Sequence, residues 1–175
     1  MKKALSLICI LALLFSVLSP SAFALDAQTE DPVIPPDVVN SVTYPYYTTT
    51  ALNLRSGPGT SYSVITTIPS GTRVRLSTYR DGWGYITYSN YTGYVSMDYL
   101  IGAASVRSVN RYAGTALRST ASSVGSVIGT LNVGTVMQYL SSVNSSWYRV
   151  KVLSGSYAGS TGYVASSDVA AVSTS

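Results

Sequence analysis

The stretch LRSGPGTSYSVITTIPSGTRVRLSTYRDGWGYI, residues 54–86, is followed by a second version of itself, LRSTASSVGSVIGTLNVGTVMQYLSSVNSSWYRV, at residues 117–150. The matching pieces include Leu54-Arg55-Ser56 with Leu117-Arg118-Ser119, Val64-Ile65 with Val127-Ile128, Trp83 with Trp147, and Gly93-Tyr94-Val95 with Gly162-Tyr163-Val164. The offset between them is 63 positions at first, then 64, and finally 69, so the second copy is slightly longer. An internal repeat of this kind indicates repeated structural units. The chain therefore contains two copies of one small module.

Within each copy the sequence is typical of short β-strands. Turn-forming groups such as Gly57-Pro58-Gly59 and Asp81-Gly82 separate runs rich in Val, Ile, Thr and Tyr. In residues 72–76 apolar and charged residues alternate, which predicts that Val74 and Leu76 turn inward and the two arginines outward. No stretch after the N-terminal segment shows a convincing helical period. We therefore expect an all-β chain that folds as two small β-barrels in tandem.

The N-terminal residues have the pattern of an export signal. Lys2 and Lys3 precede an apolar run that ends at Pro20, and Ala22-Phe23-Ala24 supplies the small residues required for cleavage. The run is shorter than the ~20 residues that span a bilayer, which favours a cleaved signal peptide at 1–24 over a retained anchor. Residues 25–46 are acidic and rich in proline, so we expect a disordered tether there. The product is expected to be secreted, extracellular or wall-associated, without stable membrane insertion.

The composition left after cleavage excludes several chemistries. Cys9 is the only cysteine and lies in the signal, and the chain contains no histidine. A cysteine peptidase needs a thiolate and a base, and a zinc hydrolase needs imidazole or thiolate ligands. Glu30 is the only glutamate, and Asp81 and Asp98 are expected in a turn and a loop, which disfavours the paired carboxylates of a glycosidase. We expect no enzyme activity, no metal and no cofactor.

The charge of the repeat region narrows the class of partner. Beyond the tether, nine basic residues stand against three acidic ones. A modest positive field favours anionic partners such as polymers of the bacterial envelope. The basic residues are scattered and form no run typical of a nucleic-acid site, so no nucleic-acid partner is expected.

The motifs of the first copy resemble those of the bacterial SH3 (SH3b) family. They are Leu52 to Tyr62 (LNLRSGPGTSY), Val64-Ile65, Ile68 to Thr72 (IPSGT), Gly82 to Ile86 (GWGYI) and Gly93-Tyr94-Val95, in the family's order. The resemblance implies a tandem pair of SH3-like barrels, one at 47–101 and one at 112–172, joined by a connector at 102–111. The second copy departs from the pattern, since Thr120-Ala121-Ser122 stands where the first has Gly57-Pro58-Gly59.

The resemblance also implies a function without catalysis. Exported SH3b domains commonly attach proteins to peptidoglycan, where they recognise stem or bridge peptides. We therefore expect a cell-wall binding protein whose partner is peptidoglycan or another wall polymer. The alternatives are a secreted adaptor that binds another exported protein and a targeting subunit for a separately encoded cell-wall hydrolase.

Aromatic residues are the main candidates for the ligand site. By strand alternation Trp147 shares a face with Arg149, opposite Val150, and Trp83 lies on the face opposite Ile86. An outward aromatic platform can bind peptide or sugar, although a tryptophan in a small barrel also serves as a packing residue. Arg55 and Arg118 have two possible roles as well, a clamp for a ligand carboxylate or a tie to loop carbonyls. The candidate ligand-binding residues are Trp83, Tyr62, Tyr79, Tyr91, Trp147 and Arg149.

Overall fold

The computed structural model of the chain describes residues 45–111 and 113–174. The expected signal peptide and most of the expected tether lie outside these residues. Within the described part of the chain, no helix has the length and apolar character needed to cross a membrane.

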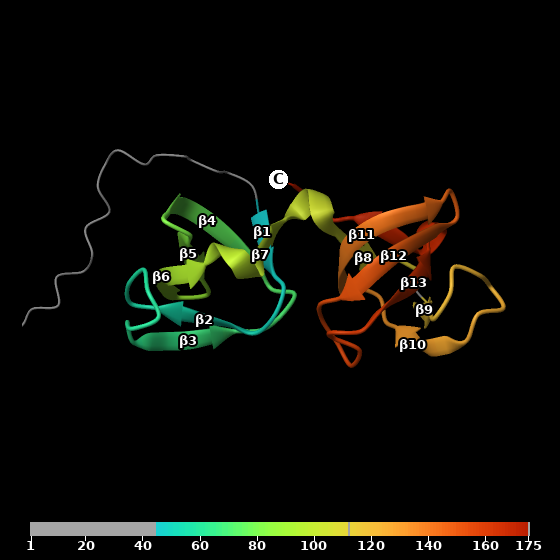
Figure 1. The fold of residues 1–175 in the computed structure, drawn as a ribbon, viewed down its shortest axis with the longest axis horizontal. Helices are drawn as coiled ribbons and strands as arrows, with labels where there is room; N and C mark the ends of the chain where they lie inside the picture. The colour runs from blue at the N-terminus through green and yellow to red at the C-terminus, as the bar shows by residue number, and fades with distance from the viewer. Residues whose placement is uncertain (1–44, 112, 175) are drawn as a thin grey trace, which may run out of the picture. The chain divides into compact units, whose positions relative to one another are not determined.

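The first module is a seven-stranded antiparallel sheet in which the strand order is β3-β2-β6-β5-β4-β1-β7 (Figure 1). A short 3-10 turn, η1 (Met97–Tyr99), leads into the last strand. The strands are β1 (Pro45–Thr48), β2 (Leu52–Arg55), β3 (Val64–Ile68), β4 (Arg73–Arg80), β5 (Trp83–Tyr88), β6 (Tyr91–Ser96) and β7 (Leu100–Gly102).

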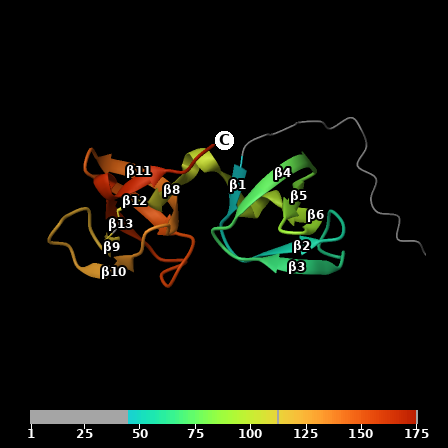
Figure 2. The ribbon, with the colours of Figure 1, turned by 180° about the vertical axis from the view of Figure 1, so that it is seen from behind.

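The second module repeats this topology, with the order β10-β9-β13-β12-β11-β8-β14. Figure 2 shows strands β8 to β13 from behind. The 3-10 turn η3 (Ser166–Asp168) takes the place of η1, and η2 (Ala103–Ser105) lies between the two modules in sequence. The strands are β8 (Val106–Val109), β9 (Thr115–Arg118), β10 (Val127–Leu131), β11 (Val136–Asn144), β12 (Trp147–Val152), β13 (Thr161–Ala165) and β14 (Val169–Ala171).

The strands extend beyond the expected domain limits. Strand β1 begins at Pro45, and β8 lies within the segment 102–111 that was expected to be a connector. Strand β8 pairs with β11 and with β14, as β1 pairs with β4 and β7. Each module therefore has a first strand that bonds to its last strand.

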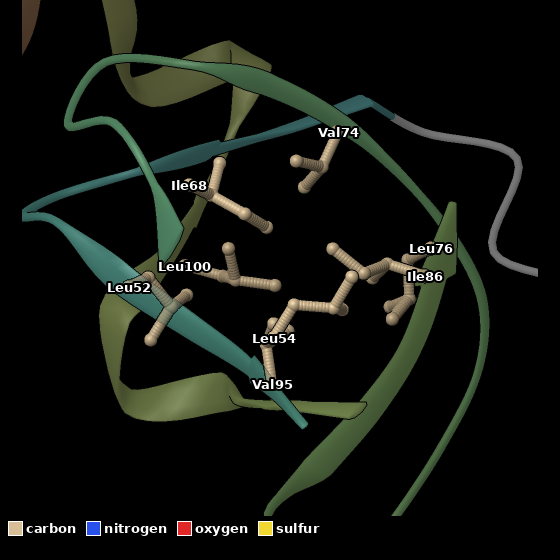
Figure 3. Packing of buried hydrophobic residues seen from close by; sticks show 8 residues of the cluster. All are labelled: Leu52, Leu54, Ile68, Val74, Leu76, Ile86, Val95 and Leu100. Atoms are coloured by element: carbon tan, nitrogen blue, oxygen red, sulfur yellow. The ribbon is translucent and has the colours of Figure 1, made fainter. Parts of the chain in front are cut away.

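Side-chain alternation along the strands builds the core of the first module. In β4 the expected pattern is confirmed, because Val74 and Leu76 are buried while Arg73 and Arg75 are exposed. Six strands contribute to one cluster, which requires the sheet to curve around it. Figure 3 shows the ribbon surrounding these side chains, which are Leu52, Leu54, Ile68, Val74, Leu76, Ile86, Val95 and Leu100.

The core of the second module uses most of the same repeat positions. Leu117 replaces Leu54, Leu131 replaces Ile68 and Val164 replaces Val95, and all are fully or nearly fully buried. The position of Leu52 differs, because there the second module buries the polar Thr115. A third, smaller cluster combines buried Tyr47, Ala103 and Val106 with partly buried Ile101, Val136 and Val172.

The pair Gly71-Thr72 recurs as Gly134-Thr135, and the backbone explains its glycine. Gly71 and Gly134 adopt φ angles of 72° and 82° at the turns before β4 and β11. Residues with a side chain rarely adopt this left-handed conformation, so glycine is the residue that allows the chain to reverse there. The repeat thus preserves a turn as well as a core.

Candidate binding grooves

The two tryptophans occupy equivalent places at the start of a central strand. Trp83 begins β5 and lies opposite Ser96 of β6, and Trp147 begins β12 and lies opposite Ala165 of β13. Both are half-buried, while Ile86 and Val150 on the other face of the same strands are fully buried. The burial pattern thus places both indole rings on the outward face of their modules.

Beside Trp83 the surface forms a groove of about 440 Å³, which we call groove 1. It lies between β2, the loop that follows it, β5 and η1. Its only charged lining residue is Arg55. The lining residues are Thr50, Ala51, Leu52, Asn53, Arg55, Thr60, Trp83, Ser96 and Tyr99.

The second module has a groove of about 280 Å³ at the same repeat positions, which we call groove 2. Arg118 and Trp147 stand where groove 1 has Arg55 and Trp83. Asp168 stands where groove 1 has Tyr99, and Thr115 stands where it has Leu52. The other lining residues of groove 2 are Arg111, Gly114, Ala116, Ser123 and Ala165.

The repeated arginine ties a loop to the wall of each groove. Arg55 Nη1 donates to the carbonyl of Thr60 at 3.1 Å and to that of Tyr62 at 2.8 Å. Arg118 Nη1 donates to the carbonyl of Gly125 at 2.8 Å. Gly125 and Tyr62 are equivalent in the repeat, so the same tie is made twice. Of the two roles weighed for these arginines, the structure shows the loop tie. Because each guanidinium carries five N–H donors, the tie leaves other donors beside the groove.

The loops held by these arginines carry a glycine and a larger residue at opposite positions in the two modules. In the first module the ring of Tyr62 covers Gly57, where an added Cβ would come within 2.3 Å of the ring. In the second module glycine stands at the position of Tyr62, and a Cβ on Gly125 would come within 2.2 Å of the hydroxyl of Thr120. Thr120 is the equivalent of Gly57. The first loop therefore presents an aromatic ring, 41% exposed, that the second lacks.

The remaining predicted site residues lie outside the linings of the two grooves. Tyr79 is exposed on β4 opposite Gly84, and Tyr91 is exposed at the start of β6 opposite Tyr88. Arg149 is exposed on β12 next to Tyr163, on the outward face that Trp147 shares. Of the six predicted residues, the structure places only Trp83 and Trp147 in the groove walls.

Tyr99 and Asp168 are among the lining residues that strand alternation missed. Tyr99 and Asp168 belong to the 3-10 turns η1 and η3, which carry no period-2 pattern. Tyr99 lines groove 1 together with Leu52 of β2, and Asp168 accepts a hydrogen bond from Thr115 of β9, although each pair is far apart in sequence. The offset of 69 positions that relates Gly93-Tyr94-Val95 to its copy also relates Tyr99 to Asp168, and this signal could have paired them.

The carboxylate of Asp168 is buried in the wall of groove 2. Its Oδ2 accepts a hydrogen bond of 2.7 Å from the Thr115 hydroxyl, and its Oδ1 accepts bonds of 3.1 Å from Arg111 and from Ser167. Burial raises the pKa of this carboxyl, but the hydrogen bonds from Thr115, Arg111 and Ser167 outweigh burial and hold the pKa below its ordinary value of 3.8. Asp168 is therefore ionised at neutral pH.

Three curated relatives share short segments with this chain. YrvJ of Bacillus subtilis (strain 168), named as an N-acetylmuramoyl-L-alanine amidase, is 43% identical over 54 residues, which are 31% of this chain and 10% of YrvJ. The uncharacterised protein YraI of the same strain is 43% identical over 58 residues, 27% of this chain and 49% of YraI. The protein p60 of Listeria innocua, named as an endopeptidase, is 47% identical over 53 residues, 29% of this chain and 11% of p60. The shared segments thus span from about a tenth to about half of these relatives.

A solved structure, NlpC2 from Trichomonas vaginalis, is similar over 74% of this chain and 48% of its own, with 15% identity and a TM-score of 0.32. The bacterial SH3 domain family matches residues 50–101 and again residues 113–170. These two matches lie on the two modules and together cover more than half of the sequence. The chain therefore belongs to the bacterial SH3 domain family and carries two copies of that domain.

Proposed function

We propose that the chain is an exported, non-catalytic protein that attaches to peptidoglycan, and that groove 1 of the first module is its main contact with the wall peptides. The observation that carries this proposal is the groove itself, built twice around the same arginine and tryptophan. The name of YrvJ, an N-acetylmuramoyl-L-alanine amidase, supports the proposal, because muramoyl-peptide bonds belong to peptidoglycan. The name of p60 assigns it an endopeptidase activity.

The chemistry of groove 1 suits a peptide of the wall. Trp83 and Tyr99 supply aromatic surface, and Tyr99 is 47% exposed. Such rings contact the apolar parts of a peptide or sugar, while their N–H and O–H groups remain available for hydrogen bonds. Arg55 lines the same groove and is held by the loop carbonyls, and its remaining donors can bind a carboxylate or a peptide carbonyl. The groove's volume is within the range of small-ligand sites.

The residues of groove 1 favour binding over catalysis. The lining contains no carboxylate, thiol or imidazole, so it offers no general base and no ordinary metal ligand. Across the described residues, no group of three or more His, Cys, Asp and Glu side chains lies close enough together to hold a metal ion. The segments shared with the named hydrolases are the SH3 portions alone, which are usually binding modules.

The proposal is tested by sedimentation of the chain with purified, protein-free sacculi. The Trp83→Ala variant should lose at least about tenfold in affinity, because a buried aromatic contact at the centre of a site carries much of the binding energy. The matched control is Tyr91→Ala, which removes an aromatic ring of similar character that lies outside the groove. This control should bind as the unchanged chain does.

The melting temperature of each variant separates loss of binding from loss of fold. If Trp83→Ala unfolds the module, Tyr99→Ala provides the second test, because its exposed ring contributes little to the core. Failure of the unchanged chain to sediment with sacculi would reject wall binding and direct attention to an exported protein partner. Equal sedimentation of all variants would reject groove 1 as the contact.

A further inference from the structure

Groove 2 differs from groove 1 in the charge of its wall. Asp168 replaces Tyr99, and its side chain is only 10% exposed although it lines the groove. The buried Thr115 replaces Leu52 and donates its hydroxyl proton to this carboxylate. The two changes belong together, because a buried hydroxyl requires an acceptor and a buried carboxylate requires donors. They give the second module a fixed negative charge beside its tryptophan.

The neutral donors orient this carboxylate without cancelling its charge. Thr115 and Ser167 donate one hydrogen bond each, to different oxygens. Among the described residues, the cation that forms a salt bridge with Asp168 is Arg111, at 3.1 Å. A carboxylate accepts about four hydrogen bonds, so the site has room for another donor. The negative charge of Asp168 is thus balanced by a single guanidinium contact.

The contact from Arg111 is of the kind that a ligand can replace. The Arg111 side chain is 60% exposed and reaches Asp168 through one nitrogen only. Ion pairs with an exposed partner contribute little to stability, and a single-point contact lacks the two-pronged geometry that makes arginine pairs strong. Arg111 lines groove 2 itself, so its head group lies where a cationic ligand group would have to lie.

We propose that groove 2 recognises a primary ammonium group, with Asp168 as its counter-ion, the face of Trp147 as its second contact, and Arg111 as an internal competitor that the ligand displaces. An ammonium ion is compact and donates three hydrogen bonds, and it is attracted to the face of an indole ring. The smaller volume of groove 2 suits one alkylammonium side chain or one amino terminus. This inference builds on the proposed function, because it assigns to the second groove a free amine of the wall peptides.

The two tryptophans provide a reporter for each groove. The chain has two Trp residues, one in each groove, so a ¹⁵N-labelled chain gives one indole N–H signal from each. Trp83→Phe and Trp147→Phe assign them. The probe is Nα-acetyl-lysine amide, and its Nε-acetylated form is the uncharged control. Glycylglycine amide, which has a free amino terminus, distinguishes a terminal amine from a side-chain amine as the source.

We expect the lysine probe, the terminal-amine probe or both to shift the Trp147 signal saturably and to leave Trp83 in place, while the acetylated control shifts neither. Asp168→Asn should weaken binding by about tenfold, since it removes the charge but keeps an oxygen for Thr115. Arg111→Gln should strengthen binding several-fold, because the competitor is removed. An Arg111 with a purely structural role would give no such gain.

Several outcomes would overturn the inference. These are an unshifted Trp147 with both amine probes, an equal shift with the acetylated control, or weaker binding by a folded Arg111→Gln variant. The probes are soluble and need no wall material, so this result is independent of the sedimentation test. A chain that sediments with sacculi but shows no amine response keeps the proposed function and loses this inference.

Discussion

The two modules share one skeleton but present different surfaces beside it. The core positions of Leu54 and Leu117, the loop ties of Arg55 and Arg118, and the outward tryptophans are the same in both. Around them, several tyrosines of the first module are replaced in the second. Tyr62 becomes Gly125, Tyr85 becomes Arg149 and Tyr99 becomes Asp168.

This difference teaches which parts of the repeat serve the fold. Apart from the outward tryptophans, what both copies retain fills the core, turns the chain or ties the loop, and these roles do not depend on a ligand. Two of these tyrosine replacements exchange an aromatic side chain for a charged one, Arg149 or Asp168, and Thr115 replaces Leu52 at a buried position beside Asp168. Some replacements compensate each other in size. Gly57 and Tyr62 of the first module correspond to Thr120 and Gly125 of the second, so each loop keeps one glycine beside a larger side chain. Each module therefore remains well packed while its surface chemistry diverges.

The largest expected effect is a loss of stability in either core. Leu54→Ala and Leu117→Ala each remove a fully buried side chain at equivalent positions. Each should lower the free energy of unfolding of its own module by about 3 kcal/mol, from the lost transfer energy and the cavity left behind. Urea unfolding followed by the fluorescence of the module's own tryptophan measures this, with the other Trp changed to Phe. A difference of more than about 2 kcal/mol between the two losses would show that the two cores are not equivalent.

The second largest effect is a difference in stability between the modules at one equivalent position, which is Tyr99 in the first and Asp168 in the second. Asp168→Ala should destabilise the second module by about 1–3 kcal/mol, because the buried hydroxyl of Thr115 then lacks its acceptor. Tyr99→Ala, the matched change in the first module, removes an exposed ring and should change stability by less than about 0.5 kcal/mol.

The double variant Thr115→Leu with Asp168→Ala refines this test. It restores the apolar residue of the first module and removes the hydroxyl that needs a partner. We expect it to recover part of the stability that Asp168→Ala loses. No recovery would show that Asp168 acts mainly through Arg111 and Ser167 rather than through Thr115.

The sequence predicted the strands better than the grooves, for a physical reason. Alternation in residues 73–76 depends on neighbouring residues, and it placed Val74 and Leu76 in the core correctly. The same alternation indicated the outward face for Trp83 and Trp147. A groove wall, however, joins strands to turns that are distant in sequence, so Tyr99 and Asp168 escaped a local pattern. Tyr79 and Tyr91 share the composition of a binding surface but lie elsewhere on the sheet.

The smallest expected effect is a dependence of stability on pH that belongs to the second module alone. The pKa of Asp168 is lower in the folded chain than its ordinary value of 3.8, because the bonds from Thr115, Arg111 and Ser167 outweigh the opposing effect of burial. The ionised carboxylate of Asp168 therefore stabilises the folded chain at pH values above 3.8. This contribution is lost as the pH falls through the pKa that Asp168 has in the folded chain.

The stability difference between the unchanged chain and Asp168→Asn should accordingly be constant from about pH 7 to about pH 5 and shrink below about pH 4. Urea midpoints of the second module at a series of pH values measure it. Tyr99→Phe is the control in the first module, since it leaves every carboxyl group of the chain in place, and its difference should stay flat. A difference for Asp168→Asn that grows in acid would mean that the folded state favours the protonated carboxyl, which would contradict a lowered pKa for Asp168.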